Sequence, residues 1–310
     1  MSAQELESII TMLRTSGPDL AAPPPEAREN FEAMLAGIPV GEDVVFDTAT
    51  VGGVPARWST TPGASKERVL LYLHGGGYLL GSSLGYRPLF SALARDAGAR
   101  GLALDYRLAP ESPFPAAVED AVSGYRGLLA QGIAPGAIAI AGDSAGGGLT
   151  VAMLVAARDA GLPMPAAAVA ISPWADLECT GASMLSKAAA DPAVNREGLF
   201  QIGTVYLNGA SPRSALASPI YASLAGLSPL LIQVGSAEVL LDDATRLAAR
   251  AGEADVEVQL EIWPRMPHVW HLFAFALSEG REAIDRAGAF VAAQFQKQHS
   301  QKSMAADERR

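Results

Sequence analysis

Residues 138–149 read Ile-Ala-Ile-Ala-Gly-Asp-Ser-Ala-Gly-Gly-Gly-Leu, an apolar run that leads into a glycine-framed serine. The frame is G-x-S-x-G, with Gly142, Ser144 and Gly146 in its fixed positions. This pattern is typical of a strained turn between a strand and a helix, where the serine hydroxyl projects above a sheet. A chance match is the alternative in a chain with 31 glycines, but the apolar strand before the motif and the helix formers after it argue against coincidence. The segment therefore predicts a nucleophile at Ser144.

Apolar runs typical of strands buried on both faces recur on either side of this unit. Helical stretches separate them at the spacing of right-handed βαβ units, which predicts one open, mostly parallel, doubly wound sheet. A hairpin turned at Gly52-Gly53 precedes it. The predicted strands are 43–49, 54–60, 68–74, 102–105, 137–141, 166–172, 229–234 and 256–262, and the predicted helices are 86–97, 116–131, 144–160, 237–251 and 280–298.

Two segments depart from this alternation. Residues 177–225 carry helical pieces but no convincing strand, and an insertion after a strand end is typical of a lid. Residues 1–42 show helical spacing broken by Gly17-Pro18 and by prolines 23–25. We expect both segments to form a helical cap over a catalytic domain of residues 43–176 and 226–298. Residues 299–310 are expected to be a polar, frayed tail.

A second glycine motif, His-Gly-Gly-Gly-Tyr at 74–78, follows a predicted buried strand. A tetrahedral intermediate of acyl transfer needs two or three N–H donors aimed at one oxygen, and glycines let the backbone turn those donors inward. We assign this oxyanion hole to the N–H groups of Gly75, Gly76 and Ala145, with His74 bracing the loop. An ordinary glycine-rich turn is the alternative if the motif is taken alone.

Four stretches carry a family resemblance: HGGGY (74–78), DYRLAPESPFPAAVED (105–120), GDSAGGGL (142–149) and SPWADL (172–177). With them the chain resembles the hormone-sensitive-lipase-like esterases, bacterial family IV, from about residue 68 to about residue 275. The resemblance implies an α/β fold of the α/β-hydrolase type, with helices flanking the sheet and a helical cap. It implies a carboxylesterase for short- to medium-chain acyl esters that needs no cofactor, and a homodimer formed through the last strand and helix.

The base and acid of a triad follow the serine in chain order in this fold. His268 comes just after the last predicted strand, where the resembling family commonly has its histidine, and His271 is the rival. The family usually places an aspartate after the preceding strand; here Glu238 stands at that position. A glutamate can fix the imidazole tautomer and stabilise the imidazolium. Asp242 and Asp243 remain alternatives for the acid.

An apolar substrate pocket is predicted beside these groups. We expect Tyr78, Leu79 and Trp174 to line it together with residues of the 177–225 insertion, although ordinary core packing is the alternative for each. A lactonase or an amidase would use the same machinery. A non-catalytic small-molecule receptor on the same scaffold is less favoured, because the gibberellin receptors that resemble this family lack the catalytic histidine and His268 is present.

Composition limits the remaining possibilities. The 310 residues are 49% hydrophobic, enough for a large core, and carry a formal charge of −10. An acidic chain without a basic stripe is a poor candidate for binding nucleic acid or an anionic membrane. The single cysteine, Cys179, excludes an intramolecular disulfide, and neither a signal peptide nor an apolar run of membrane-spanning length is evident. We therefore expect a cytoplasmic protein without membrane insertion.

Overall fold

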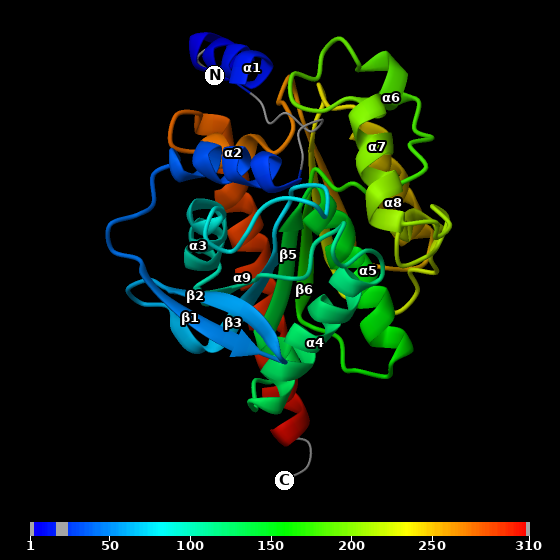
Figure 1. The fold of residues 1–310 in the computed structure, drawn as a ribbon. Coiled ribbons are helices and arrows are strands. Elements are labelled where there is room, and N and C mark those ends of the chain that lie inside the picture. Colours follow the sequence, from blue (N-terminus) through cyan, green and yellow to red (C-terminus); the bar gives the residue numbers. More distant parts are fainter. Residues whose placement is uncertain (1–2, 17–23, 308–310) are drawn as a thin grey trace.

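A central eight-stranded sheet organises the chain in a computed structural model, which describes residues 3–16 and 24–307 (Figure 1). The strand order is β1-β2-β4-β3-β5-β6-β7-β8. β1 and β2 form the predicted hairpin, in which Gly52 and Gly53 adopt positive φ angles of 61° and 82°. β2 pairs antiparallel with β4, and all later pairings are parallel. The strands are β1 Val45–Val51, β2 Val54–Thr60, β3 Ser65–Leu73, β4 Ala99–Leu104, β5 Ile138–Asp143, β6 Ala167–Ile171, β7 Leu230–Gly235 and β8 Val258–Trp263.

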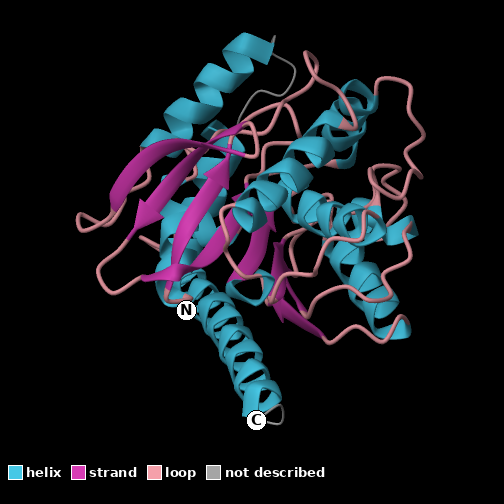
Figure 2. Ribbon diagram, turned by 90° about the horizontal axis from the view of Figure 1, so that it is seen from below, coloured by secondary structure: helices cyan, strands magenta, loops and turns pink. Residues whose placement is uncertain are grey.

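Helices cover both faces of this sheet, as the alternating pattern predicts (Figure 2). Along β3 the side chains alternate between two cores: Leu71 and Leu73 join the core that includes α4, α5 and α8, whereas Leu70 and Tyr72 join the core that includes α3 and α9. The α/β-hydrolase fold prediction is confirmed. The longer helices are α1 Ala3–Ser16, α2 Pro24–Ala36, α3 Arg87–Asp96, α4 Ala116–Ala130, α5 Ala145–Asp159, α7 Arg196–Leu207, α8 Leu241–Glu253 and α9 Ser278–Asp307.

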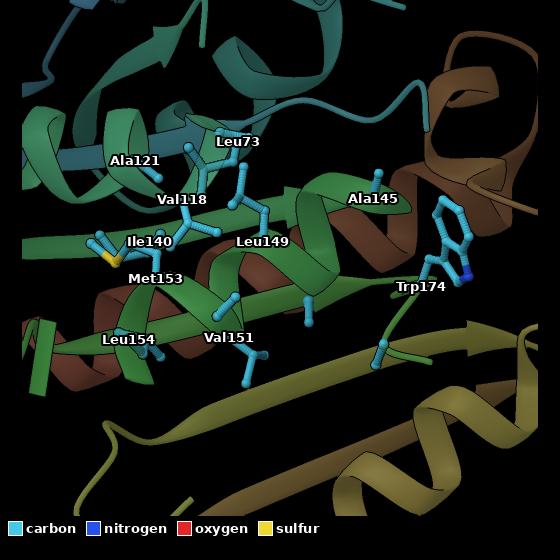
Figure 3. Close-up of a cluster of buried hydrophobic side chains, with 14 of the residues drawn as sticks. Leu73, Val118, Ala121, Ile140, Ala145, Leu149, Val151, Met153, Leu154 and Trp174 are labelled. Carbon is cyan, nitrogen blue, oxygen red and sulfur yellow. The ribbon is translucent and has the colours of Figure 1, made fainter. Parts of the chain in front are cut away.

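The helix that follows the serine motif, α5, is buried along most of its length (Figure 3). Its residues Leu149 and Met153 pack in the same core as Val118 of α4 and Ile140 of β5. Because close-packed interiors resist displacement, this burial fixes the start of α5, where Ser144 lies, relative to the sheet.

The segments expected to form a cap lie at the end of the molecule above the carboxyl ends of the parallel strands (Figure 1). Within residues 177–225 the structure has helix α6 (Ser183–Ser186), helix α7 and a short 3₁₀ turn, η2 (Pro219–Tyr221), but no strand. α1 and α2 pack through Leu6, Phe31 and Leu35 into the core that contains α3.

The two ends of the chain bear on the remaining predictions. The predicted break at Gly17-Pro18 lies outside the described residues. Residues 299–307, expected to be a frayed tail, continue helix α9, and residues 308–310 lie outside the described part. Across the described ranges, no helix has both the length and the apolar character required to cross a lipid bilayer.

Candidate active site

Ser144 occupies the sharp turn between β5 and α5 that its motif predicts. Its φ and ψ are 53° and −122°, a positive-φ conformation that is strained for a residue with a side chain. Its N–H donates to the Ile171 carbonyl oxygen at 2.8 Å, and its own carbonyl accepts from Trp174 N at 2.9 Å. A Cβ on Gly146 would lie 2.0 Å from the Leu73 carbonyl oxygen, so the glycine frame is a steric requirement of this turn.

The predicted base and acid lie beside this serine. His268 Nε2 is 2.8 Å from Ser144 Oγ, and His268 Nδ1 is 2.9 Å from Glu238 Oε2. Glu238 is fully buried, and its Oε1 accepts from the Gly235 N–H at 2.6 Å and from the Ser172 hydroxyl at 2.7 Å. Because an ionised carboxylate can only accept, this arrangement places the imidazole proton on Nδ1 and leaves Nε2 to accept from the serine.

The rival residues have other partners. His271 Nε2 contacts Gln233 Oε1 at 2.9 Å. The carboxylate of Asp242 accepts the Ser183 N–H, and that of Asp243 accepts the N–H groups of Ala175 and Asp176, just before the insertion. Among the three candidate acids, the structure therefore brings only Glu238 to His268.

The electrostatic environment distinguishes the two histidines. Burial lowers the pKa of His268, but its hydrogen bond to Glu238 and the charge of that carboxylate outweigh this effect and raise the pKa above its usual value. Burial, followed by the charge of His268, lowers the pKa of His271 to about 3. The protonated form is therefore stabilised at His268 and not at His271. A group that takes a proton from a serine requires such stabilisation.

The glycine loop departs from the sequence prediction at its first glycine. The N–H of Gly75 donates to Asp143 Oδ1 at 2.9 Å, so it is engaged away from any oxyanion. Gly76 and Gly77, with φ angles of 109° and 65°, line the cavity above Ser144, and in the described part of the chain their N–H groups have no acceptor. Ala145 begins α5, where N–H groups have no intrahelical partner.

Asp143, the residue before the serine, holds this loop in place. It is fully buried and also accepts from the hydroxyls of Tyr72 at 2.6 Å and Tyr86 at 3.1 Å. Burial raises its pKa to about 6, against the opposing effect of these donors. His74 braces the same loop as expected, through a 2.7 Å contact between its Nδ1 and the Gly75 carbonyl oxygen and by stacking on Tyr106.

An apolar cavity of about 110 Å³ opens above Ser144 and His268. Four parts of the chain build its walls: the two N-terminal helices, the loop between β3 and α3, the segment from Trp174 into the insertion, and the segment after His268. The lining side chains from these parts are Leu13, Phe31 and Met34; Leu80 and Tyr86; Trp174, Ala193, Val194, Leu199 and Ile202; and Val269, Leu272 and Phe273.

Of the three predicted substrate contacts, only Trp174 lines this cavity. Tyr78 has a positive φ of 65°, is buried, and stacks face to face on Tyr206 with ring centroids 3.8 Å apart. Leu79 is half-buried, and its carbonyl oxygen accepts from Arg28 Nε at 2.8 Å. The turn at Tyr78 directs both side chains away from the cavity, and the next residue, Leu80, lines it instead.

Sequence reasoning missed Ser172 and Asp191. Ser172 follows β6 directly and bonds Glu238, and its position at the carboxyl end of a parallel strand could have indicated it. Asp191 begins an Asp-Pro-Ala-Val stretch and caps it with its side chain, a turn signal of the Asx type. Within residues 3–16 and 24–307, no cluster of three or more His, Cys, Asp or Glu residues could hold a metal ion.

Similarity to known proteins extends over most of the chain. The Abhydrolase_3 family model, described as the alpha/beta hydrolase fold, matches residues 70–272. An acetyl-hydrolase of Streptomyces hygroscopicus is 54% identical over 265 residues, which cover 86% of each chain. An ethyl acetate hydrolase of Pseudomonas putida is 33% identical over 280 residues, 84% of this chain and 86% of that protein. The crystal structure of an esterase from the bacterial hormone-sensitive lipase family is 50% identical with a TM-score of 0.91, covering 95% of this chain and 99% of the other.

Proposed function

Because the chain belongs to the Abhydrolase_3 family of α/β hydrolases and is a carboxylesterase of the hormone-sensitive-lipase-like group, we propose that Ser144, His268 and Glu238 form its catalytic triad. The observation that carries this proposal is the pair of contacts at His268, 2.8 Å to Ser144 Oγ and 2.9 Å to Glu238 Oε2. Both distances suit hydrogen bonds along which a proton can move.

In the proposed reaction, His268 Nε2 takes the proton of Ser144 as Oγ attacks the ester carbonyl. Glu238 keeps the ring oriented and stabilises the imidazolium, and the pKa of His268 lies above its usual value for this reason. His268 then protonates the leaving alcohol, and the acyl group remains on Ser144. Water activated by the same imidazole hydrolyses this acyl-enzyme and restores the serine.

We assign the oxyanion to the N–H groups of Gly76, Gly77 and Ala145. The support is that Gly76 and Gly77 line the cavity beside Ser144, whereas the N–H of Gly75 is bound to Asp143. A Cβ on Gly77 would lie 2.8 Å from Ile202 Cγ2, so a side chain here would push against the insertion. Preorganised backbone donors of this kind supply a large share of catalysis in acyl transfer.

For the substrate we propose esters with short to medium acyl chains. The cavity is small and apolar, and two relatives carry the names acetyl-hydrolase and ethyl acetate hydrolase. We further propose that α1, α2 and residues 177–225 act together as a cap, because both parts contribute side chains to the same cavity. Lactones and amides are alternative substrates of this machinery, and rates on matched ester and anilide substrates separate them.

We propose a homodimer assembled through β8, which among the described strands has a sheet neighbour only on its β7 side. Leu260 and Ile262 on this strand are 36% and 46% exposed. We also propose a cytoplasmic location, supported by the buried and unpaired thiol of Cys179.

Replacing the nucleophile tests the triad. We expect Ser144→Ala to lower kcat on p-nitrophenyl acetate by at least about 10⁴-fold. The oxyanion donors should leave a small residual activity. An organophosphate should label the parent enzyme at Ser144, which mass spectrometry can locate. Ser186→Ala, at an exposed serine of α6, is the matched control. Turnover by Ser144→Ala at the parent rate, or an adduct on another residue, would refute the assignment.

A further inference from the structure

Asp191, in the insertion between α6 and α7, is a buried carboxylate that joins two separate parts of the active site. Its Oδ1 accepts the N–H groups of Ala193 at 2.9 Å and Val194 at 3.1 Å. Its Oδ2 accepts the N–H of Val239 at 2.9 Å. Only 9% of the residue is exposed, so these bonds face little competition from water.

The two parts it joins have different tasks. Ala193 and Val194 form part of the cavity wall that a substrate would touch. Val239 directly follows Glu238, the proposed acid of the triad. Charge-assisted hydrogen bonds to backbone N–H groups are about twice as strong as neutral ones. A single side chain therefore fixes both the wall of the cavity and the loop that carries Glu238.

Asp191 also adds a negative charge close to the imidazole. The ionisable groups that face His268 are Glu238 from the loop after β7, Asp143 from the end of β5, Asp191 from the insertion and His271 from the segment after it. After burial, which lowers the pKa of His268, and Glu238, which raises it most, the charge of Asp191 raises it further.

We propose that Asp191 is a positioning residue of the esterase reaction, which couples the cavity wall at Ala193 and Val194 to the Glu238–His268 pair. The inference rests on the proposed triad. Its first consequence is electrostatic: the carboxylate favours the imidazolium that forms when Ser144 attacks. Its second is mechanical, because an acyl group that presses on the wall acts on the same side chain that holds Val239.

The substitution Asp191→Asn removes the charge and turns an amide donor toward one set of backbone N–H groups. We expect the acidic limb of the kcat/KM profile to move to lower pH by roughly half a unit. We also expect kcat to fall by roughly three- to tenfold, and KM to rise more for butyrate than for acetate esters because a longer acyl group reaches more of the wall. Asp47→Asn, at an exposed carboxylate on β1, is the matched control and should leave both quantities unchanged.

A second variant separates charge from geometry if Asp191→Asn folds poorly. Asp191→Glu keeps the charge but displaces the carboxylate, so its acidic limb should stay with that of the parent while its KM rises. Two results would overturn the proposed coupling between the cavity wall and the Glu238–His268 pair. One is an acidic limb of the kcat/KM profile that moves equally in both variants, and the other is an acidic limb that does not move in Asp191→Asn.

The pH dependence of serine labelling distinguishes failure of this inference from failure of the triad. If a fluorophosphonate does not label Ser144 in the parent, the proposed function fails. If the parent is labelled at Ser144 and Asp191→Asn is labelled with the same pH dependence, the triad stands and the role of Asp191 is refuted.

Discussion

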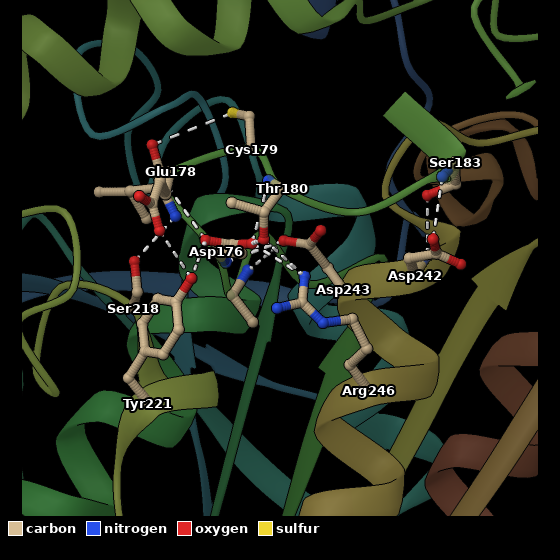
Figure 4. Close-up of polar contacts among 12 residues, drawn as sticks. Asp176, Glu178, Cys179, Thr180, Ser183, Ser218, Tyr221, Asp242, Asp243 and Arg246 are labelled. Atoms are coloured by element: carbon tan, nitrogen blue, oxygen red, sulfur yellow. Dashed lines mark hydrogen bonds and ion pairs between the residues drawn. The ribbon is translucent and has the colours of Figure 1, made fainter. Parts of the chain in front are cut away.

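Asp243 is fully buried, although its carboxyl group is of a kind that is usually ionised. It lies near Asp176 and Arg246 (Figure 4). Its Oδ2 accepts the N–H groups of Ala175 and Asp176 at 2.9 Å each, and Oδ1 has no hydrogen-bond partner in the described structure. Burial, reinforced by the charge of Asp176, raises the pKa of Asp243 well above its usual range. The folded protein therefore holds a proton on this group that the unfolded chain releases at a lower pH.

The sign of the resulting pH dependence follows from linkage. A raised pKa in the folded state contributes stability at pH below the unfolded pKa, and this contribution is lost as pH rises toward the folded pKa. Asp243→Asn keeps an acceptor for the two N–H groups and has no proton to lose. We expect the variant to melt about 2–4 °C above the parent at pH 8, equivalent to about 1 kcal/mol, and this gain to vanish near pH 4. Melting curves of the parent, of Asp243→Asn and of the exposed-site control Asp159→Asn check this. If the melting temperatures of the parent and of Asp243→Asn changed with pH in parallel, the prediction would be contradicted.

At this scale the sequence predicts some roles and not others. Ser144 and His268 could be assigned because a local motif and the order of elements limit where they lie. The donor role given to Gly75 could not be checked from sequence, since its N–H is taken by a carboxylate 68 residues away. Glu238 and Asp243 both lie within nine residues after the end of β7. Chain order therefore does not distinguish them, and only the fold shows that Glu238 is the one that contacts His268.

Arg28 fixes helix α2 to the site by hydrogen bonds, in addition to the apolar packing of Phe31 and Leu35. Arg28 donates through Nε to the Leu79 carbonyl oxygen at 2.8 Å and through Nη2 to that of Ala109 at 2.8 Å. It also pairs with both oxygens of Glu111, at 2.9 and 2.7 Å. Bidentate arginine pairs of this kind fix orientation as well as distance. Since α2 supplies Phe31 and Met34 to the cavity, Arg28 helps to define its wall.

Loss of this attachment should weaken substrate binding more than chemistry. We expect Arg28→Met to raise KM roughly fivefold, the equivalent of about 1 kcal/mol, while kcat changes less than twofold. Glu111→Gln leaves the two carbonyl contacts in place and should have a smaller effect. Arg126→Met, at an exposed arginine of α4, serves as the control. Steady-state kinetics on a p-nitrophenyl ester measures all three, and a fall in kcat at constant KM in Arg28→Met would argue against a binding role for α2.

The elements themselves were predictable where periodicity is strong. Inner strands such as β5 and β6 carry continuous apolar runs because helices cover both faces of the sheet, whereas the edge strand β8 alternates apolar and polar residues. The structure places the parallel strands within a few residues of their predicted bounds. The attachment of the N-terminal helices was not predictable, because Arg28 reaches partners 51 to 83 residues away. The orientation of the Tyr78 side chain was not predictable either, because the positive φ that directs it is not evident from the sequence.

At the scale of the whole molecule, β8 ends the sheet, and no strand in residues 3–16 and 24–307 lies beyond it. An edge strand presents unpaired N–H and C=O groups and can pair with another chain unless charge or covering segments prevent it. On β8, Leu260 and Ile262 are two residues apart, so they lie on the same face of the strand, and both are exposed. A two-fold axis beside β8 would join two eight-stranded sheets into one and bring these side chains against their copies.

This geometry makes the proposed dimer testable without disturbing the active site. We expect the parent to sediment at about twice its chain mass of 32.1 kDa, and Leu260→Lys/Ile262→Lys to sediment as a monomer. Two lysines brought against their copies place like charges together across the axis, which disfavours pairing. Neither residue lines the cavity above Ser144, so the monomeric variant should retain its kcat on a short ester. Leu185→Lys, at a residue of α6 that is 75% exposed, is the control and should remain dimeric. A monomeric parent would contradict the homodimer, whereas a dimeric lysine variant would show that the interface lies elsewhere than β8.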